Sequence, residues 1–142
     1  MNNLVSEAKI TRVENAAAAA QTDVTTDSVD MQGFGSCCFI IAAGAIADTG
    51  TFDAHAEGSS DDSNWDELDA SITQMVTADD NKLAVLEIVN PQHRYLRVVI
   101  ERGTADSSVD SVIAIQTAAD REPVTQSATV DSATVVHAPA AI

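Results

Sequence analysis

The alternation of apolar and polar residues in RYLRVVIER, residues 94–102, constrains the fold more than any other feature of this sequence. Successive side chains of a β-strand point to opposite sides, so a period of two is typical of a half-buried strand. Leu96, Val98 and Ile100 are expected on one face. The opposite face is expected to carry Tyr95, Arg97, Val99 and Glu101.

The polar, glycine-containing segment GTADSS follows this strand and predicts a hairpin loop. VDSVIAIQTA is then the return strand, with Val109, Ile113 and Ile115 expected to share one face. The continuous apolar run at residues 36–46 predicts a buried strand, and residues 82–89 predict another strand. Alternation over 51–57 predicts a half-buried strand. About eight short strands with turn signals roughly every ten residues favour an all-β sandwich or barrel.

Two segments allow more than one interpretation. AAAAA at residues 16–20 would ordinarily favour helix, but β-forming residues flank it, so a small-residue turn or short helix between two strands is expected. SNWDELDASITQMV begins with Ser63 and Asp66 at capping-box spacing. The favoured interpretation is one helical turn followed by a strand from Ser71 to Thr77, and a longer helix is the alternative.

The length of 142 residues favours one domain with a real core. We divide the chain into an N-terminal arm at 1–12, a sandwich at 13–123 and a polar, Ser/Thr/Ala-rich C-terminal arm at 124–142. Aromatic residues make up only 4%, so the core is built mainly from small aliphatic side chains. Such a core indicates a thin sandwich or additional burial through oligomerisation.

The formal net charge of −15 argues against nucleic acid or an anionic membrane as a partner, because both would be repelled. The N-terminus lacks the basic and apolar regions of a signal peptide, and no run of about 18 apolar residues could span a membrane. Cys37 and Cys38 are adjacent and point to opposite faces of a strand, so a disulfide between them is not expected. Free thiols fit a reducing cytoplasm.

No catalytic or metal-binding motif is apparent, and neither an enzyme nor a cofactor is expected. Asp62, Asn64 and Asp66 have the spacing of a calcium loop, but Glu67 and Thr73 stand where such a loop needs glycine and glutamate. A solvated acidic loop is favoured over an opportunistic cation site. The histidines lie in separate segments without ligand spacing, at His55, His93 and His137.

The arginines are the most informative polar residues, since three of the seven basic residues fall between residues 94 and 102. Two interpretations are balanced: ion pairs with acidic residues of the same sandwich, or contacts between subunits, where the planar guanidinium is favoured. Apolar residues of the two arms could add strands to a neighbouring sheet. The residues expected at an oligomer or capsid interface are Arg94, Tyr95, Arg97, Arg102, Val5, Ile10, Val135 and Val136.

DNKLAVLEIVNPQHRYLRVVIERGTADSSVDSVIAIQTAADREPV, with the upstream VDMQGFGSCCFIIAAGAI, resembles the head decoration, or cement, proteins of tailed bacteriophages. The resemblance covers roughly residues 5–125. It implies a jelly-roll-like antiparallel β-sandwich that binds the major capsid protein on the outside of the virion, often as a homotrimer, and stabilises the expanded shell. It also implies synthesis in the bacterial host cytoplasm. It transfers no catalytic residues.

Two alternatives remain open at this point. One is another virion component, such as a neck, tail-terminator or fibre-base protein. The other is a carbohydrate- or ligand-binding jelly roll. The scarcity of aromatic residues, with Trp65 and Tyr95 the only ones besides three Phe, counts against a sugar site.

Overall fold

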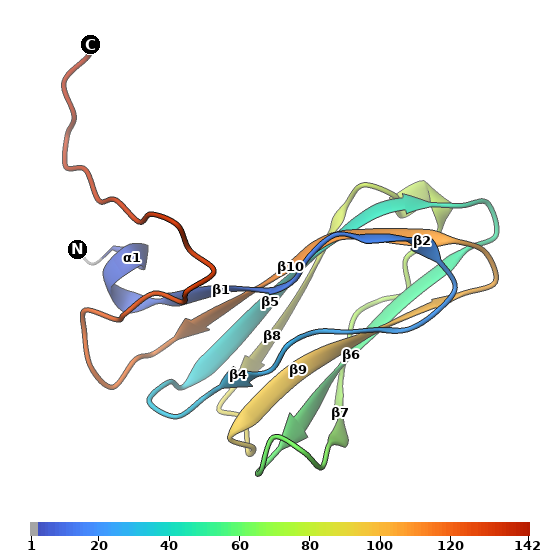
Figure 1. Cartoon of the computed structure of the whole chain (residues 1–142), viewed down its shortest axis with the longest axis horizontal. Helices are drawn as coiled ribbons and strands as arrows, with labels where there is room; N and C mark the ends of the chain where they lie inside the picture. The colour runs from blue at the N-terminus through green and yellow to red at the C-terminus, as the bar shows by residue number, and fades with distance from the viewer. Residues whose placement is uncertain (1–2) are drawn as a thin grey trace.

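The computed structural model describes residues 3–142. Strands make up 49% of the chain and helices 5%. Two antiparallel sheets pack face to face, which confirms the expected β-sandwich (Figure 1). The helical elements are α1 (Leu4–Glu7) and the 3₁₀ turn η1 (Thr77–Asp79). The strands are β1 (Lys9–Glu14), β2 (Ala17–Ala20), β3 (Val24–Thr25), β4 (Val29–Asp30), β5 (Ser36–Ile46), β6 (Thr51–Ser59), β7 (Asp66–Ser71), β8 (Leu83–Val89), β9 (Tyr95–Gly103) and β10 (Ser107–Thr117).

Sheet A has the strand order β1-β10-β5-β8, and β2 also pairs with β10. Sheet B has the order β3-β9-β6-β7, and β4 also pairs with β9. Along the chain, β1–β2, β5, β8 and β10 enter sheet A, while β3–β4, β6–β7 and β9 enter sheet B. This repeated crossing between two five-stranded sheets is a jelly-roll-like topology.

The core lies between the two sheets and is built from the alternating inward side chains of both. β5 contributes Cys37, Phe39 and Ile41, each fully buried, from the run SCCFIIAAGAI. β9 contributes Leu96, Val98 and Ile100, also fully buried, as the alternation predicted. Phe39 and Phe52 are the largest fully buried side chains, and most of the others are Ile, Leu or Val. The core is therefore mainly aliphatic, as the composition indicated.

The return strand of the hairpin differs from the prediction in which side chains face inward. A bulge interrupts the pairing of β10 with β5 between Val109 and Ser111. Because one extra residue reverses the alternation, Val112 and Ala114 enter the core after Val109, and Ile113 and Ile115 face outward. The expectation that Ile113 and Ile115 share a face with Val109 is therefore wrong.

Two local predictions were also wrong. Residues 17–20 of the poly-alanine run form β2, because pairing with β10 overrides the helical preference of alanine. The expected helical turn near Ser63 is a loop, and the strand lies at Asp66–Ser71 instead of beyond Ser71. The carboxylate of Asp61 accepts the backbone N–H groups of Ser63 and Asn64 at 3.0 and 2.8 Å, which stabilises the bend.

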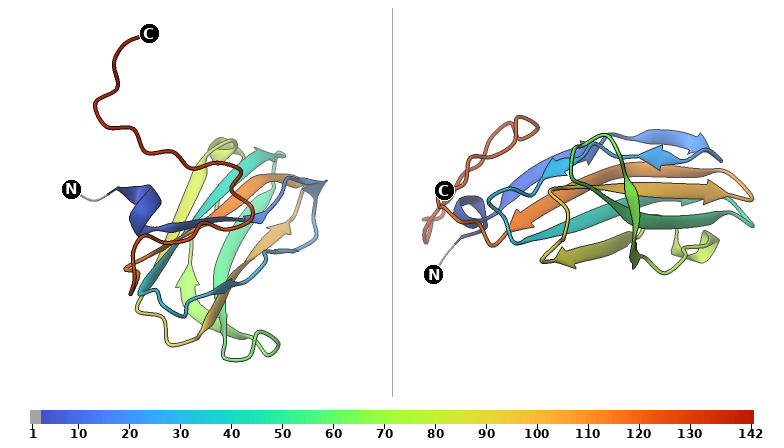
Figure 2. Two further views of the ribbon diagram at one scale, coloured as in Figure 1. Left: turned by 60° about the vertical axis from the view of Figure 1, so that its left-hand side comes forward. Right: turned by 90° about the horizontal axis from the view of Figure 1, so that it is seen from below.

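Both arms are shorter than the predicted division, because part of each is bound to the sandwich. β1 begins at Lys9, inside the segment assigned to the N-terminal arm, and pairs with β10. The C-terminal segment runs past α1 and β1, then leaves the sandwich as an exposed, extended arm over residues 131–142 (Figures 1 and 2). Within residues 3–142, no helix is long and apolar enough to cross a membrane.

Candidate functional site

The two sheets present chemically opposite surfaces to the outside. The outward side of sheet A is mainly aliphatic, although Arg12 and Glu87 of its two edge strands also lie on it, and we call it the apolar face. Its members are Ile10, Cys38, Ile40, Ala42, Leu83, Val85, Val89, Ile113 and Ile115. Leu83, Val85 and Val89 of the edge strand β8 are 63%, 61% and 63% exposed. A contiguous exposed apolar patch of this kind marks a surface that another protein covers.

The strand register explains why these side chains form one patch. Val85 lies opposite Ile40 on β5, and Ile40 lies opposite Ile113 on β10. In the next row Cys38 lies between Ile115 and Glu87. Directly opposite residues have Cβ atoms about 5 Å apart, so each row is a continuous band of side chains across the sheet.

The outward side of sheet B is acidic, and we call it the acidic face. Its members are Asp53, His55, Glu57, Glu67, Arg97 and Glu101. Asp53 lies directly opposite Glu101, an arrangement that is unfavourable between like charges. The imidazole of His55 lies 3.4 Å from Glu101, 3.6 Å from Glu57 and 3.7 Å from Glu67. This face therefore suits contact with solvent.

Arg94 and Arg97 form ion pairs within the sandwich, which was one of the two interpretations of the arginines. Arg97 binds Glu57 at 2.7 Å, and both side chains are partly buried. Arg94 donates from Nε and Nη2 to the two carboxylate oxygens of Asp30, at 3.0 and 2.9 Å. These hydrogen bonds lower the pKa of Asp30 and raise that of Arg94. Tyr95 lies beside Arg94, whose guanidinium is 5.1 Å from the ring centre.

Arg102 was expected at an oligomer or capsid interface, and the structure corrects that assignment. The side chain lies inside the sandwich and is 5% exposed. Nη1 donates to the carbonyl oxygens of Ala18 and Ser107 at 2.7 Å, and Nε donates to that of Thr22 at 2.8 Å. The guanidinium thus binds β2 and the β2–β3 connection to the β9–β10 hairpin, and it is unavailable to a partner.

The four arm residues named from the sequence lie in three different settings. Val5 is in α1, and its carbonyl accepts a hydrogen bond from Gln126 at 2.9 Å. Ile10 is in β1 and contributes to the apolar face. Val135 and Val136 are 39% and 62% exposed on the extended C-terminal arm. The structure therefore does not bring the eight predicted interface residues together into one site.

The acidic loop does not assemble the calcium site considered from the sequence. Asp61 uses its carboxylate on the backbone and side chain of its own loop, and these hydrogen bonds hold its pKa well below the ordinary value. Asp62 accepts from the hydroxyl of Ser28 at 2.6 Å, and Asp66 faces His93 at 3.5 Å. Among residues 3–142, no group of three His, Cys, Asp or Glu side chains is placed to hold a metal ion.

The adjacent cysteines are both free and lie on opposite sides of sheet A. Cys37 is fully buried in the core, and burial raises the pKa of its thiol to about 12. Cys38 is on the apolar face and partly exposed; burial, followed by the charge of Glu87, raises its pKa as well. The rate at which a thiol reagent labels Cys38 can therefore show whether the apolar face is covered.

The apolar face was missed from the sequence, although a signal for it was present. The continuous apolar run at residues 36–46 predicts a buried strand. A run such as SCCFIIAAGAI also means that both faces of its strand are apolar.

Comparison of the chain with protein-family models and with curated proteins finds no match.

Proposed function

We propose that this chain is a structural protein of a tailed-bacteriophage virion, a decoration protein that binds the outer surface of the capsid and stabilises the expanded shell. The observation that carries the proposal is the separation of the apolar face on sheet A from the acidic face on sheet B. A protein of this role needs one surface that packs on the shell and one that faces water. The resemblance between residues 5–125 and decoration proteins supports the same role.

In this proposal the apolar face packs on the major capsid protein. Covering Leu83, Val85 and Val89 removes aliphatic area from water, which favours binding by about 25 cal/mol per Å² before the costs of association. The acidic face remains in solvent, where a high net charge keeps decorated particles apart. Binding needs no catalytic group and no cofactor.

Repetition of the contact strengthens such binding. A shell offers the same site many times, and an oligomer that engages several capsid subunits binds more tightly than one copy does. We propose a homotrimer as the bound form, assembled in the host cytoplasm before it joins the particle. Nucleic acid and membrane have no part in this role.

The test compares two single lysine substitutions on opposite faces. Purified protein is added to expanded capsids that lack it, and occupancy is measured by quantitative mass spectrometry of sedimented particles. Val85→Lys places a charge on the apolar face and is expected to weaken binding at least about tenfold. Glu67→Lys changes an exposed position on the acidic face and is expected to bind like the wild type. Equal occupancy by the two variants would overturn the apolar face as the capsid contact.

A second measurement distinguishes decoration from another place in the virion. The copy number of this chain in purified particles, scaled to the major capsid protein, should approach that of the capsid protein. A count far below it would move the chain to the neck, tail or fibre base. Absence from the particle would overturn the virion role itself.

A further inference from the structure

We infer that the open edge of β8 accepts, as an added strand, the C-terminal arm of a second copy of this chain. The contact involves the backbone edge of the strand, whereas the proposed capsid contact involves the outward side chains of sheet A. The inference concerns the isolated protein and does not depend on the capsid.

The edge strands of the two sheets, apart from β8, have features that protect them from pairing with another chain. An exposed strand edge pairs readily with other chains unless charge, shortness or a covering segment prevents it. The edge of β1 is covered, because Ile10 N–H donates to Oε1 of Gln126 at 2.8 Å and Arg12 N–H to Oγ1 of Thr129 at 2.9 Å. β7 carries three acids in six residues, and β3 and β4 have two residues each. β8, LAVLEIV, has seven residues and one charge.

Along this edge the backbone of β8 has hydrogen-bonding groups that no residue between 3 and 142 pairs with. Lys82 C=O accepts from Ala43 at 3.1 Å, and Asn90 N–H donates to Gly35 at 2.9 Å, so the even-numbered residues face β5. Alternation in an antiparallel pair then directs the N–H and C=O groups of residues 83, 85, 87 and 89 away from β5. Such a row of unpaired groups is what an added strand requires.

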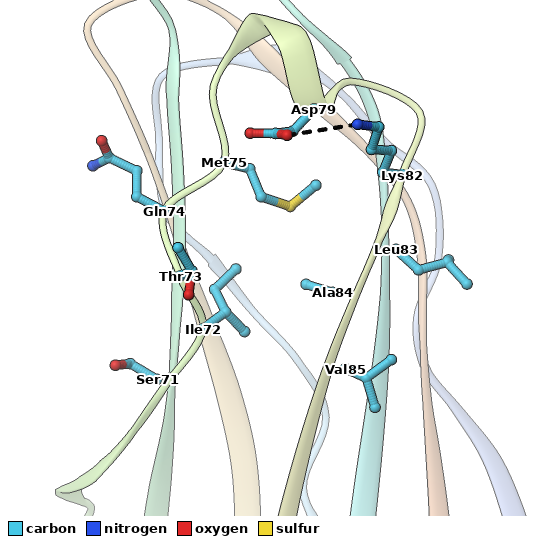
Figure 3. Close-up of a pocket in the computed structure, with 10 residues that line it drawn as sticks. All are labelled: Ser71, Ile72, Thr73, Gln74, Met75, Asp79, Lys82, Leu83, Ala84 and Val85. Atoms are coloured by element: carbon cyan, nitrogen blue, oxygen red, sulfur yellow. Dashed lines mark ion pairs between the residues drawn. The ribbon is translucent and has the colours of Figure 1, made fainter.

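Space for the added strand is present beside this edge. A pocket of about 440 Å³ lies between β8 and the segment that follows β7 (Figure 3). Ile72, Met75 and Ala84 line it between the two segments. Leu83 and Val85 of β8 also line it. One side of an incoming strand would face this pocket, and its other side would extend the apolar face.

The C-terminal arm has the length and side chains that this edge accepts. Residues 131–142 are exposed and make no hydrogen bond to the rest of the described chain. Between Asp131 and Pro139 lie seven residues, SATVVHA, which equals the length of β8. Pro139 lacks an N–H and ends the pairing. Since Val135 and Val136 are adjacent, one faces the pocket and the other extends the apolar face.

Charge also favours the arm over another acidic surface. The segment 124–142 holds one of the 22 acidic residues, Asp131, so the other 21 lie in residues 1–123. Two sandwich bodies brought edge to edge would repel one another through these charges, and two Glu87 side chains would enter the same interface. The arm can approach β8 at lower electrostatic cost.

The arm is too short to pair along its full length with β8 of its own chain. Thr129 is held at β1, and the position beside β8 is four strand spacings away, about 19 Å at roughly 4.8 Å each. The three residues from Thr129 to Ser132 span at most about 11 Å. The arm must therefore come from a second copy. Each copy then has one donor and one acceptor, a head-to-tail contact that closes into rings such as a trimer or extends into chains.

The experiment combines a truncated chain with the missing arm as a peptide. Full-length protein and a chain ending at Val130 are compared by sedimentation at about 0.15 M and 0.5 M salt, since screening weakens the repulsion between acidic bodies. Only the full-length chain is expected to form oligomers. A labelled peptide of residues 130–142 should bind the truncated chain, and Val136→Asp in the peptide should weaken binding at least about tenfold. Ala141→Asp, outside the pairing segment, is the matched control.

The acceptor edge is tested separately in the truncated chain. Val85→Pro removes an edge N–H and should abolish peptide binding, with circular dichroism as the check on folding. If that variant unfolds, a peptide N-methylated at Val135 or Val136 gives the same information, because one of the two N–H groups must face β8. If both N-methylated peptides bind as tightly as the unmodified peptide, strand addition is overturned.

Other outcomes would identify a different occupant. Oligomers that persist in the truncated chain would overturn the arm as the donor. A peptide that binds while the full-length chain stays monomeric would overturn donation of the arm from one copy to another. Since no capsid is present, none of these results bears on the capsid test above.

Discussion

The guanidinium carbon of Arg97 lies 4.1 Å from the centre of the Trp65 ring. Nη2 of the same side chain binds Glu57 at 2.7 Å, so the cation is held between an aromatic face and a carboxylate. Trp65 is the only tryptophan of the chain and sits in the loop before β7. The contact therefore joins that loop to the middle strands of sheet B.

Arg97→Gln is expected to lower the free energy of unfolding by about 1 kcal/mol, because both the cation–π contact and a partly buried ion pair are lost. It should also change the fluorescence of Trp65, which reports the loop directly. Urea unfolding followed by that fluorescence measures both effects. Arg121→Gln, at an exposed position beyond β10, is the control. Equal effects of the two substitutions would show that the Arg97 contact contributes nothing.

Arg102→Leu is expected to be far more destabilising, by about 3 kcal/mol, because three carbonyl groups lose their shared donor inside the sandwich. The measurement is chemical denaturation by circular dichroism. Hydrogen exchange should show that β2 opens first, since Arg102 holds Ala18. A variant as stable as the wild type would contradict a structural role for this arginine.

Ser107→Ala, unlike Arg102→Leu, should not lower the free energy of unfolding. The Ser107 hydroxyl is buried and has no hydrogen-bond partner among residues 3–142. Removing it eliminates a desolvated polar group while the carbonyl that binds Arg102 remains. Stability equal to or above that of the wild type is expected in the same denaturation experiment, and a loss above about 1 kcal/mol would refute this.

Cys38 should react with a thiol reagent much faster than Cys37 in the folded protein at about pH 8. Cys37 is fully buried and burial raises its pKa to about 12, so the reactive thiolate is scarce and inaccessible. Mass spectrometry of labelled peptides gives the two rates, and Cys38→Ser identifies the site. On decorated capsids the labelling of Cys38 should slow, because the apolar face is covered. Unchanged labelling on the particle would argue against that face as the contact.

Asp61→Asn should destabilise the protein near neutral pH but not in strong acid. The folded-state pKa of Asp61 is lowered by hydrogen bonds from Asn64, Ser63 and Ser59. Its stabilising contribution is therefore present above the unfolded pKa of about 3.9 and is lost as the pH falls through the lower folded value. Urea midpoints of wild type and variant should converge below about pH 4. Asp69→Asn, on the exposed strand β7, is the control, and a gap independent of pH would contradict the prediction.

Much of the fold was predictable because it depends on local alternation. The run Ser36–Ile46 coincides with β5, and the inward triad Leu96, Val98 and Ile100 is fully buried. The errors occurred where non-local pairing decides the conformation. The bulge at Val109–Ser111 of β10 is set against β5, and the alanines of β2 are held by β10 and Arg102.

The candidate interface was less predictable than the strands. A sequence shows that Arg97 and Arg102 belong to one strand, and alternation places them on opposite faces. It does not show that Arg102 lies within reach of Ala18 and Thr22, which are distant along the chain. Its guanidinium was therefore assigned to a partner when it binds the chain itself.

The sequence by itself determined an acidic, all-β chain with both sides of several strands apolar and an almost uncharged C-terminal arm. Only the tertiary structure decided that β5, β8 and β10 are neighbours in one sheet, which gathers their outward side chains into a single apolar face. It also decided which edges are covered, since the C-terminal segment protects β1 and leaves β8 open. The physical reason is that hydrophobic alternation is a local property, whereas strand order and edge exposure follow from pairings between distant segments.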